Sequence, residues 1–148
     1  MGMGQKWTEQ SQVTHKKPAV IGAVIDLGNC LNLLDSECIK IVRNGYKIFS
    51  ISMILSGKEL PTNRDTSTSK NLMIRELDCA VIESIHENRT RLKEPPFDTV
   101  RGVFVEGDPV YNNSGFMDKS HIQICIRNPN CIKGFFAPRE IDKKWRIP

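Results

Sequence analysis

The stretch between Asp35 and Gly57 places apolar or small side chains three or four positions apart, and this spacing constrains the fold more than any other feature. Side chains at that spacing share one face of an α-helix. The members of the stripe are Cys38, Ile41, Val42, Gly45, Phe49 and Met53. Asp35 or Ser36 can accept a hydrogen bond from a backbone N–H of the first turn, and Gly57 can end the last turn. The sequence therefore predicts an amphipathic helix, with a change to strand left open near its β-branched end.

A second helix is predicted over residues 70–89, after a polar loop at residues 58–69. Its shared apolar face is formed by Met73, Leu77, Ala80, Val81 and Ile85. His86 follows this face in what we expect to be the last turn, where the helix dipole favours a cationic imidazole; the alternative is a catalytic role. Two consecutive prolines, Pro95 and Pro96, then break the chain.

Three further stretches have the composition of β-strands. Residues 18–28 form an apolar, β-branched run bounded by proline and glycine, which predicts a strand buried on both faces at the centre of the sheet. Residues 99–107 predict a second strand, and residues 119–136 predict two strands around a turn at residues 128–130. The fold class that follows is α+β, with two main helices and a mixed, largely antiparallel sheet.

Length and composition describe one globular domain. We expect the 148 residues to divide into an N-terminal segment at 1–17, a single α+β domain at 18–138 and a charged tail at 139–148. The sequence indicates neither a signal peptide nor a membrane span, so we expect a cytoplasmic protein without membrane contact. The net charge of +4 is scattered along the chain, which argues against nucleic-acid binding.

The five cysteines include no C-x-x-C pair and have no histidine at metal-ligand spacing. Each lies in an apolar run, so we expect buried, reduced thiols. The alternative is one reactive cysteine, which would need a neighbouring base that the sequence does not provide. We expect no metal site.

Polar side chains alternate with isoleucines along the strand predicted from residue 119. Ile122, Ile124 and Ile126 share one side, and the other side holds His121, Gln123, Cys125 and Arg127. Such a polar side either faces water or lines a ligand site. Glu106 ends the preceding strand beside Gly107, where turn chemistry and substrate contact both account for a carboxylate. Arg101 lies inside an apolar strand and needs a partner such as Asp98 or Glu106.

Four stretches of the chain carry a resemblance to a known family. They are "PAVIGAVIDLGNCLNLLD", "LDCAVIESIH", "DTVRGVFVEGDPVY" and "KSHIQICIRNPNCI", within residues 18–138. In order and spacing they resemble the C-terminal portion of an uncharacterised bacterial family related to the ADP-ribosyltransferase fold. The resemblance implies a domain that takes NAD as substrate and transfers ADP-ribose to an acceptor that the sequence does not identify.

The resemblance also implies site residues. Members of the broad fold carry an early Tyr-His-Gly strand, a middle aromatic on the nicotinamide and a late strand with a glutamate. This chain has no Tyr-His-Gly, so the first two motifs would lie before residue 1. Gln123 falls at the third position, where an amide can bind a ribose hydroxyl but cannot stabilise a developing positive charge. The implied catalytic residues are Gln123 and Glu106, and His121, Gln123 and Arg127 would contact NAD.

Three hypotheses therefore remain open. The first is an ADP-ribosyltransferase-like domain that lacks its first NAD-binding motifs in this chain. The second is a non-catalytic remnant or binding module with the same sheet. The third, a small nucleic-acid-binding domain, depends only on the positive charge. If early strands are missing, we also expect self-association or a partner chain that supplies them.

Overall fold

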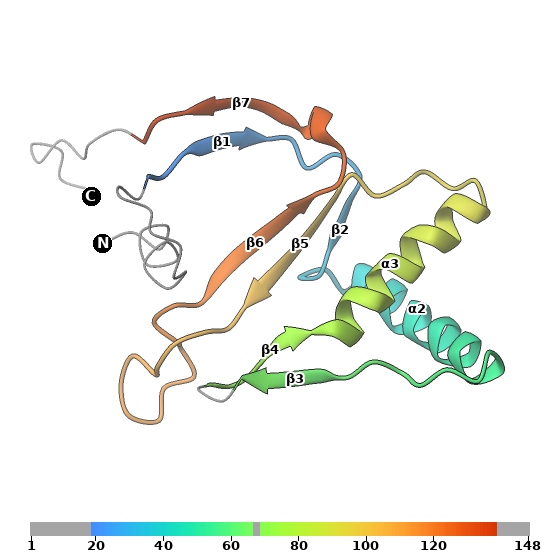
Figure 1. Cartoon of the computed structure of the whole chain (residues 1–148). Helices are drawn as coiled ribbons and strands as arrows, with labels where there is room; N and C mark the ends of the chain where they lie inside the picture. The colour runs from blue at the N-terminus through green and yellow to red at the C-terminus, as the bar shows by residue number, and fades with distance from the viewer. Residues whose placement is uncertain (1–18, 67–68, 139–148) are drawn as a thin grey trace, which may run out of the picture. The chain divides into compact units, whose positions relative to one another are not determined.

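The structure is a computed structural model that describes residues 19–66 and 69–138. Its elements follow one another along the chain as shown in Figure 1. They are β1 (Gly22–Ile25), β2 (Cys30–Asn32), α2 (Ser36–Leu55), β3 (Asn63–Thr66), β4 (Ser69–Arg75), α3 (Glu76–Arg91), β5 (Thr99–Phe104), β6 (His121–Ile126), the 3-10 helix η1 (Pro129–Cys131) and β7 (Ile132–Phe136). The predicted α+β class, with two helices and mixed, largely antiparallel sheets, is confirmed. None of the described helices is long and apolar enough to cross a membrane.

The chain divides into two compact units. The larger unit, residues 27–128, holds both helices, the three-stranded sheet β2-β5-β6 and the hairpin β3-β4. The smaller unit includes η1 and the two-stranded antiparallel sheet β1-β7. The N-terminal segment and the charged tail predicted from the sequence lie outside the described residues.

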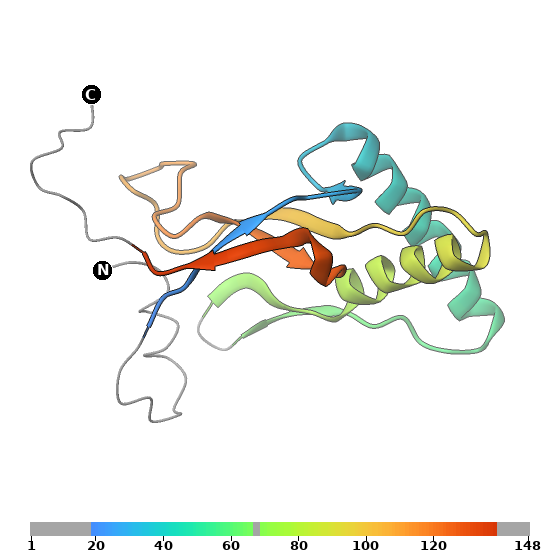
Figure 2. The same ribbon diagram turned by 90° about the horizontal axis from the view of Figure 1, so that it is seen from above.

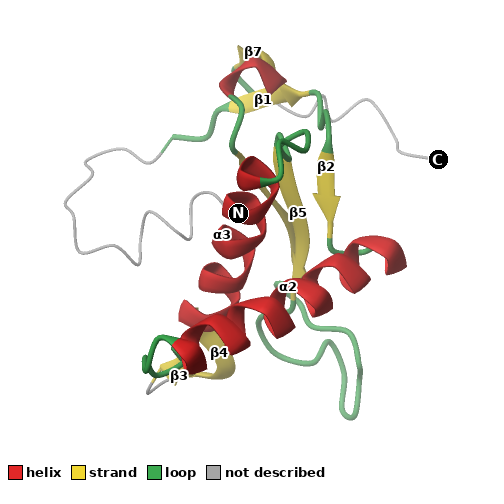
Figure 3. Ribbon diagram, turned by 90° about the vertical axis from the view of Figure 1, so that its right-hand side faces the viewer, coloured by secondary structure: helices red, strands yellow, loops and turns green. Residues whose placement is uncertain are grey.

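Strand β5 is the centre of the larger unit. It pairs in parallel with β2 and antiparallel with β6. One face of β5 packs against both helices, which lie at an angle to each other in Figure 3. The buried core residues on this side are Leu31, Val81, Ile85, Phe97 and Val100. Val100 is the residue that β5 itself contributes to this core, and alternate residues of the strand lie on the same side.

Helix α2 forms where the helical spacing predicts it. The side chain of Asp35 accepts hydrogen bonds from the backbone N–H groups of Glu37 and Cys38, at 2.9 and 3.1 Å, and so caps the first turn. The helix continues through Leu55 without changing to a strand, and Gly57 follows with a φ of 66°. Gly45 is buried in the stripe at the contact with α3.

The predicted loop is confirmed for residues 58–62, but the prediction for residues 63–66 and 69–75 is wrong. The rest of the loop and the first turns of the second helix are replaced by β3 and β4, which pair antiparallel with Asn63 opposite Arg75. Helix α3 therefore begins only at Glu76, and its first turn is capped from another strand. The side-chain oxygen of Asn63 accepts hydrogen bonds from the N–H groups of Leu77 and Asp78, at 3.0 and 3.2 Å. The hairpin supplies the cap, so tertiary pairing overrides the local helical pattern.

The prediction of one central strand at residues 18–28 is also wrong. Within that run only Gly22–Ile25 forms a strand, and its one partner is β7. Asp26 donates its backbone N–H to the carbonyl of Cys131 at 2.9 Å, and beyond it the chain enters the larger unit. The apolar run at residues 18–28 thus contributes residues to both units. Its composition predicts a strand but does not specify how many strands will pair with it.

The five cysteines form no disulfide with one another, and not all are buried. Cys131 is buried, and Cys30 and Cys38 are half-buried. Cys79 on α3 and Cys125 on β6 are exposed, which corrects the expectation of five buried thiols.

Candidate functional site

Four side chains from three strands form a connected cluster on the larger unit, which we call the His121 cluster: Arg75, Phe104, His121 and Gln123. The rings of Phe104 and His121 are stacked, with centroids 5.9 Å apart and an interplanar angle of 19°. The guanidinium of Arg75 lies 4.9 Å from the centroid of Phe104, on the ring face. Gln123 and His121 share a hydrogen bond of 2.7 Å between their Nε2 atoms.

The sheet register explains why these side chains meet. Phe104 lies directly opposite His121, and Gly102 lies opposite Gln123. Opposite residues in an antiparallel pair share a face, so the histidine and the glutamine both project beside β5. Because Gly102 has no side chain, no bulk across the strand pair competes with the glutamine amide.

The exposure of β6 contradicts the simple expectation that its polar side faces water. His121 and Gln123 are half-buried, whereas Ile122 is 49% exposed and Ile124 is 41% exposed. Over residues 121–124 the polar side is the more protected of the two, whereas farther along the strand Cys125 is exposed and Ile126 is half-buried. A buried polar group needs hydrogen-bond partners, and the bond between His121 and Gln123 meets part of that need.

Glu106 lies at the same end of the β5-β6 hairpin as His121. Its carbonyl accepts a hydrogen bond from the N–H of Lys119 at 3.2 Å, two residues before His121. Gly107 follows with a φ of 90°, and a Cβ there would collide with the carboxylate of Asp118. Figures 1 and 2 both show the loop that follows at the end of the hairpin away from the helices. The structure thus brings Glu106, His121 and Gln123 to one end of the hairpin.

Arg127 lies at the opposite end of β6. Its guanidinium binds the carboxylate of Glu83 on α3 at 2.8 Å. Its backbone N–H donates to the carbonyl of Asp98, just before β5 begins. The four residues predicted as a site are therefore separated into a group of three and a single ion-paired arginine.

Arg101 does not form the ion pair that its position predicts. It is half-buried opposite Ile124, and among the described residues it has no salt bridge with Asp98 or Glu106. Asp98 instead binds the backbone N–H of Asn29 and the side-chain amide of Asn128, each at 2.8 Å. These bonds, the one from Asn128 most strongly, lower the pKa of Asp98.

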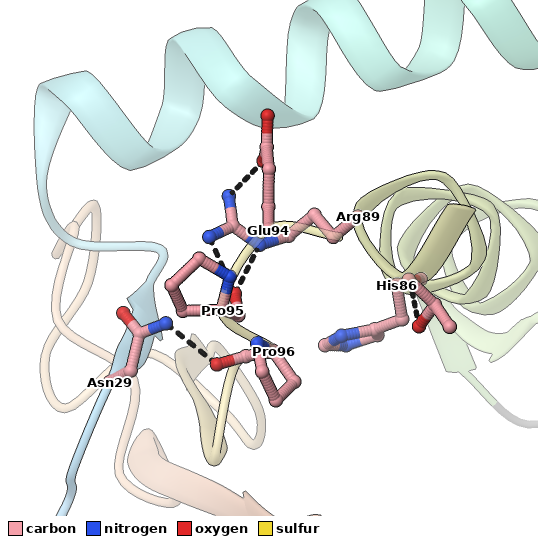
Figure 4. Close-up of polar contacts among 7 residues, drawn as sticks. Asn29, His86, Arg89, Glu94, Pro95 and Pro96 are labelled. Carbon is pink, nitrogen blue, oxygen red and sulfur yellow. Dashed lines mark hydrogen bonds and ion pairs between the residues drawn. The ribbon is translucent and has the colours of Figure 1, made fainter. Parts of the chain in front are cut away.

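His86 is a second polar feature, in the middle of α3 rather than in its last turn. Only 6% of the residue is exposed, and its ring packs edge-on against Phe97 at 5.9 Å. Figure 4 shows the ring directed toward the segment that contains Pro96. Nε2 of His86 has no hydrogen-bond partner among the described residues. The expectation of a dipole-stabilised cation is wrong.

Burial lowers the pKa of His86, and the positive charges of Arg127 and Arg89 add to this effect while Glu83 opposes it. Contacts of their own hold the side chains around His86 in place. Arg89 lies over the ring of Phe97 at 4.3 Å, binds the carbonyl of Pro95 and pairs with Glu94 at 3.0 Å (Figure 4). This arrangement holds a neutral imidazole in the core, which is a packing role.

A groove of about 630 Å³ lies between α2 and α3, away from the His121 cluster. It is lined by Ile48, Ile51, Ser52, Leu55, Ser56, Ser84, Glu87, Asn88 and Arg91. None of the residues predicted as a site lines it. We take the His121 cluster as the candidate site because its members combine polar, aromatic and cationic groups in defined contact. The groove holds a hydrogen-bonded pair, Arg91 and Asn88, but no aromatic side chain lines it.

The chemistry available to the His121 cluster is hydrogen bonding and aromatic contact. Gln123 and His121 supply polar atoms, and Arg75 supplies a positive charge over the ring of Phe104. Sequence reasoning missed two members of the cluster. Arg75 was assigned to a helix, and the contribution of Phe104 depends on the strand register.

No family model, curated protein or solved structure matches the chain.

Proposed function

We propose that the chain is an ADP-ribosyltransferase-like domain that acts on NAD and whose 148 residues do not include the first two NAD-binding motifs of that fold. The sequence resemblance over residues 18–138 motivates the proposal. The observation that best supports it is the pairing of Gln123 with His121, at the strand position that the resemblance assigns to the third motif.

The reaction has a defined balance. The glycosidic bond between ribose C1 and the nicotinamide nitrogen breaks, and its electron pair leaves with nicotinamide. The acceptor forms a new bond to C1 and gives up a proton. Gln123 would accept a hydrogen bond from a ribose hydroxyl, which orients the sugar. Glu106 is the carboxylate proposed to face the charge that develops at C1, because it lies at the same end of the hairpin.

The contacts of Arg127 do not support a role for this residue at the proposed site. It is paired with Glu83 at the other end of β6, and that pair serves packing between the sheet and α3. His121 takes the role of a residue that supports Gln123. The acceptor is a protein, a nucleic acid or a small molecule. The test below measures release of nicotinamide, which requires only water as the acceptor.

The test is a titration of the chain with NAD, followed by NMR of side-chain amides and by release of nicotinamide. We expect NAD at millimolar concentration to shift the side-chain amide of Gln123. In Gln123→Ala the affinity for NAD should fall about tenfold, as expected for loss of a hydrogen bond to the ligand. Arg127→Lys, at the residue that follows β6, is the control and should bind NAD as the wild type does. Equal NAD binding by Gln123→Ala and the wild type would overturn the proposal.

A second candidate function is a binding module without catalysis. The observation that favours it is the neutral amide of Gln123 at the position where the fold uses a carboxylate. The same titration separates the two functions. Binding of NAD without any release of nicotinamide, unchanged by Glu106→Gln, would indicate the binding module. Release of nicotinamide that Glu106→Gln abolishes would indicate the transferase.

A further inference from the structure

We propose that His121 is a positioning residue that fixes the orientation of the Gln123 side-chain amide, so that the site presents a hydrogen-bond acceptor and selects a ligand group that donates. The hydrogen-bond geometry of the two side chains carries this inference. Its consequence for ligand choice rests on the proposed function.

The first step concerns the tautomer of His121. Nδ1 of its ring lies 2.8 Å from the backbone carbonyl oxygen of Lys119. A carbonyl oxygen can only accept a hydrogen bond, so Nδ1 must carry the proton. In a neutral imidazole the other nitrogen, Nε2, then has a lone pair and acts as an acceptor.

The second step concerns the amide of Gln123. Its nearest atom to His121 Nε2 is at 2.7 Å, and an acceptor at that distance requires a donor. The amide NH2 of Gln123 must therefore face the ring, and the carbonyl oxygen Oε1 must point away from it. The reversed amide would place an oxygen lone pair against a nitrogen lone pair, which is repulsive.

The third step concerns what holds the imidazole ring in place. Stacking on Phe104 at 5.9 Å and the bond to Lys119 restrain the plane and the rotation of the ring. Phe104 is itself covered by Arg75. The acceptor nitrogen is thus fixed by Phe104 of β5 and by the backbone of Lys119 just before β6, and the amide orientation follows from it.

The inference has a consequence for ligand chemistry. An amide held with Oε1 outward presents an acceptor to the ligand, so through this oxygen it binds a hydroxyl or N–H group and cannot bind a methyl ether, which only accepts. A freely rotating amide would bind both by turning over. His121 therefore sets specificity for a polyhydroxylated ligand such as a ribose without contacting the ligand itself.

The first measurement is made on the ligand-free protein at pH 8. Long-range ¹H–¹⁵N correlation should show His121 with the proton on Nδ1, and the side-chain NH2 of Gln123 should have one proton shifted by its bond to the ring. A proton on Nε2 of His121 would overturn the proposal. This result does not depend on NAD binding, so failure of the proposed function and failure of this inference are distinguishable.

The second measurement compares NAD with an analogue whose nicotinamide-ribose hydroxyls are methylated. Wild type should prefer NAD by about tenfold, the value of one good hydrogen bond. His121→Phe keeps the stacking partner and removes the acceptor, so this preference should fall to about twofold or less. His121→Gln restores an acceptor at similar reach and should recover the preference. Discrimination that is unchanged in His121→Phe would overturn the proposal.

Discussion

Gly45 of α2 lies directly against Ile85 of α3, and no side chain larger than hydrogen fits between the two helices at this point. A Cβ added to Gly45 would overlap the Cγ1 and Cδ1 atoms of Ile85, which is itself buried in the core. Glycine costs a helix about 1 kcal/mol relative to alanine, so its presence here reflects the close helix contact.

We expect Gly45→Ala to lower the free energy of unfolding by about 1–2 kcal/mol, because the overpacking cost exceeds the gain in helix propensity. Urea denaturation measures the change. Gly115→Ala is the matched control, since a Cβ there meets nothing within 4 Å. Ile85→Val in the Gly45→Ala background should relieve part of the overlap, and strictly additive effects of the two substitutions would contradict the proposed contact.

The cap of α2 gives a second prediction. Asp35→Ala removes the acceptor for the N–H groups of Glu37 and Cys38, and should cost about 1 kcal/mol of stability. Asp35→Ser keeps a capping oxygen and should recover most of the loss. If Asp35→Ser is as unstable as Asp35→Ala in thermal denaturation, the carboxylate has a role other than capping.

His86 predicts that stability depends on pH. Its pKa is lowered in the folded state, chiefly by burial, while in the unfolded chain it stays at about 6.5. The unfolded state therefore binds a proton at a higher pH than the folded state does. The free energy of unfolding should fall as pH drops below about 6.5, and the contribution is lost as pH passes through the folded pKa.

The measurement for His86 is urea denaturation at pH 7.5, 6.5 and 5.5. His86→Leu does not titrate and should lose less stability over this range than wild type. A slope in His86→Leu equal to that of wild type would show that another group is responsible.

The carboxylate of Asp98 gives a fourth prediction. It joins Asn29 and Asn128, from opposite ends of the larger unit, so Asp98→Ala should lower the melting temperature at pH 7. Asp108→Ala, in an exposed loop, is the control and should have little effect. Because hydrogen bonds lower the pKa of Asp98, its stabilising contribution is present above the unfolded value of about 3.9 and is lost as pH falls through the folded pKa. A melting temperature unchanged in Asp98→Ala would refute this role.

Local information in the sequence was sufficient for α2, β5 and β6. The cap at Asp35, the helical stripe and the strand alternation are all properties of short stretches, and each forms as predicted. The start of α3 was not predictable in this way. Its cap is Asn63, which is 14 residues from Leu77 in sequence and reaches it only through the β3-β4 hairpin. That β1 pairs with one strand alone, β7, likewise depends on how the sheet assembles and not on the sequence of β1.

The candidate site was predictable in part. The alternation of His121 and Gln123 places them on one side of a strand, and the structure confirms that they are in contact. Which side of β6 is protected depends on what packs beside β5, so the exposed isoleucines could not be foreseen. Phe104 joins the cluster because the strand register places it opposite His121. Arg75 joins it from the β3-β4 hairpin, in a stretch where the residue spacing predicted a helix.

The two hydrogen bonds that the carboxylate of Asp98 accepts have a consequence for the two ends of the larger unit. Asn29 and Asn128 stand at the beginning and the end of the larger unit, and one carboxylate holds both. The entry and the exit of residues 27–128 therefore lie close together, which is the arrangement that insertion of one domain into a loop of another requires.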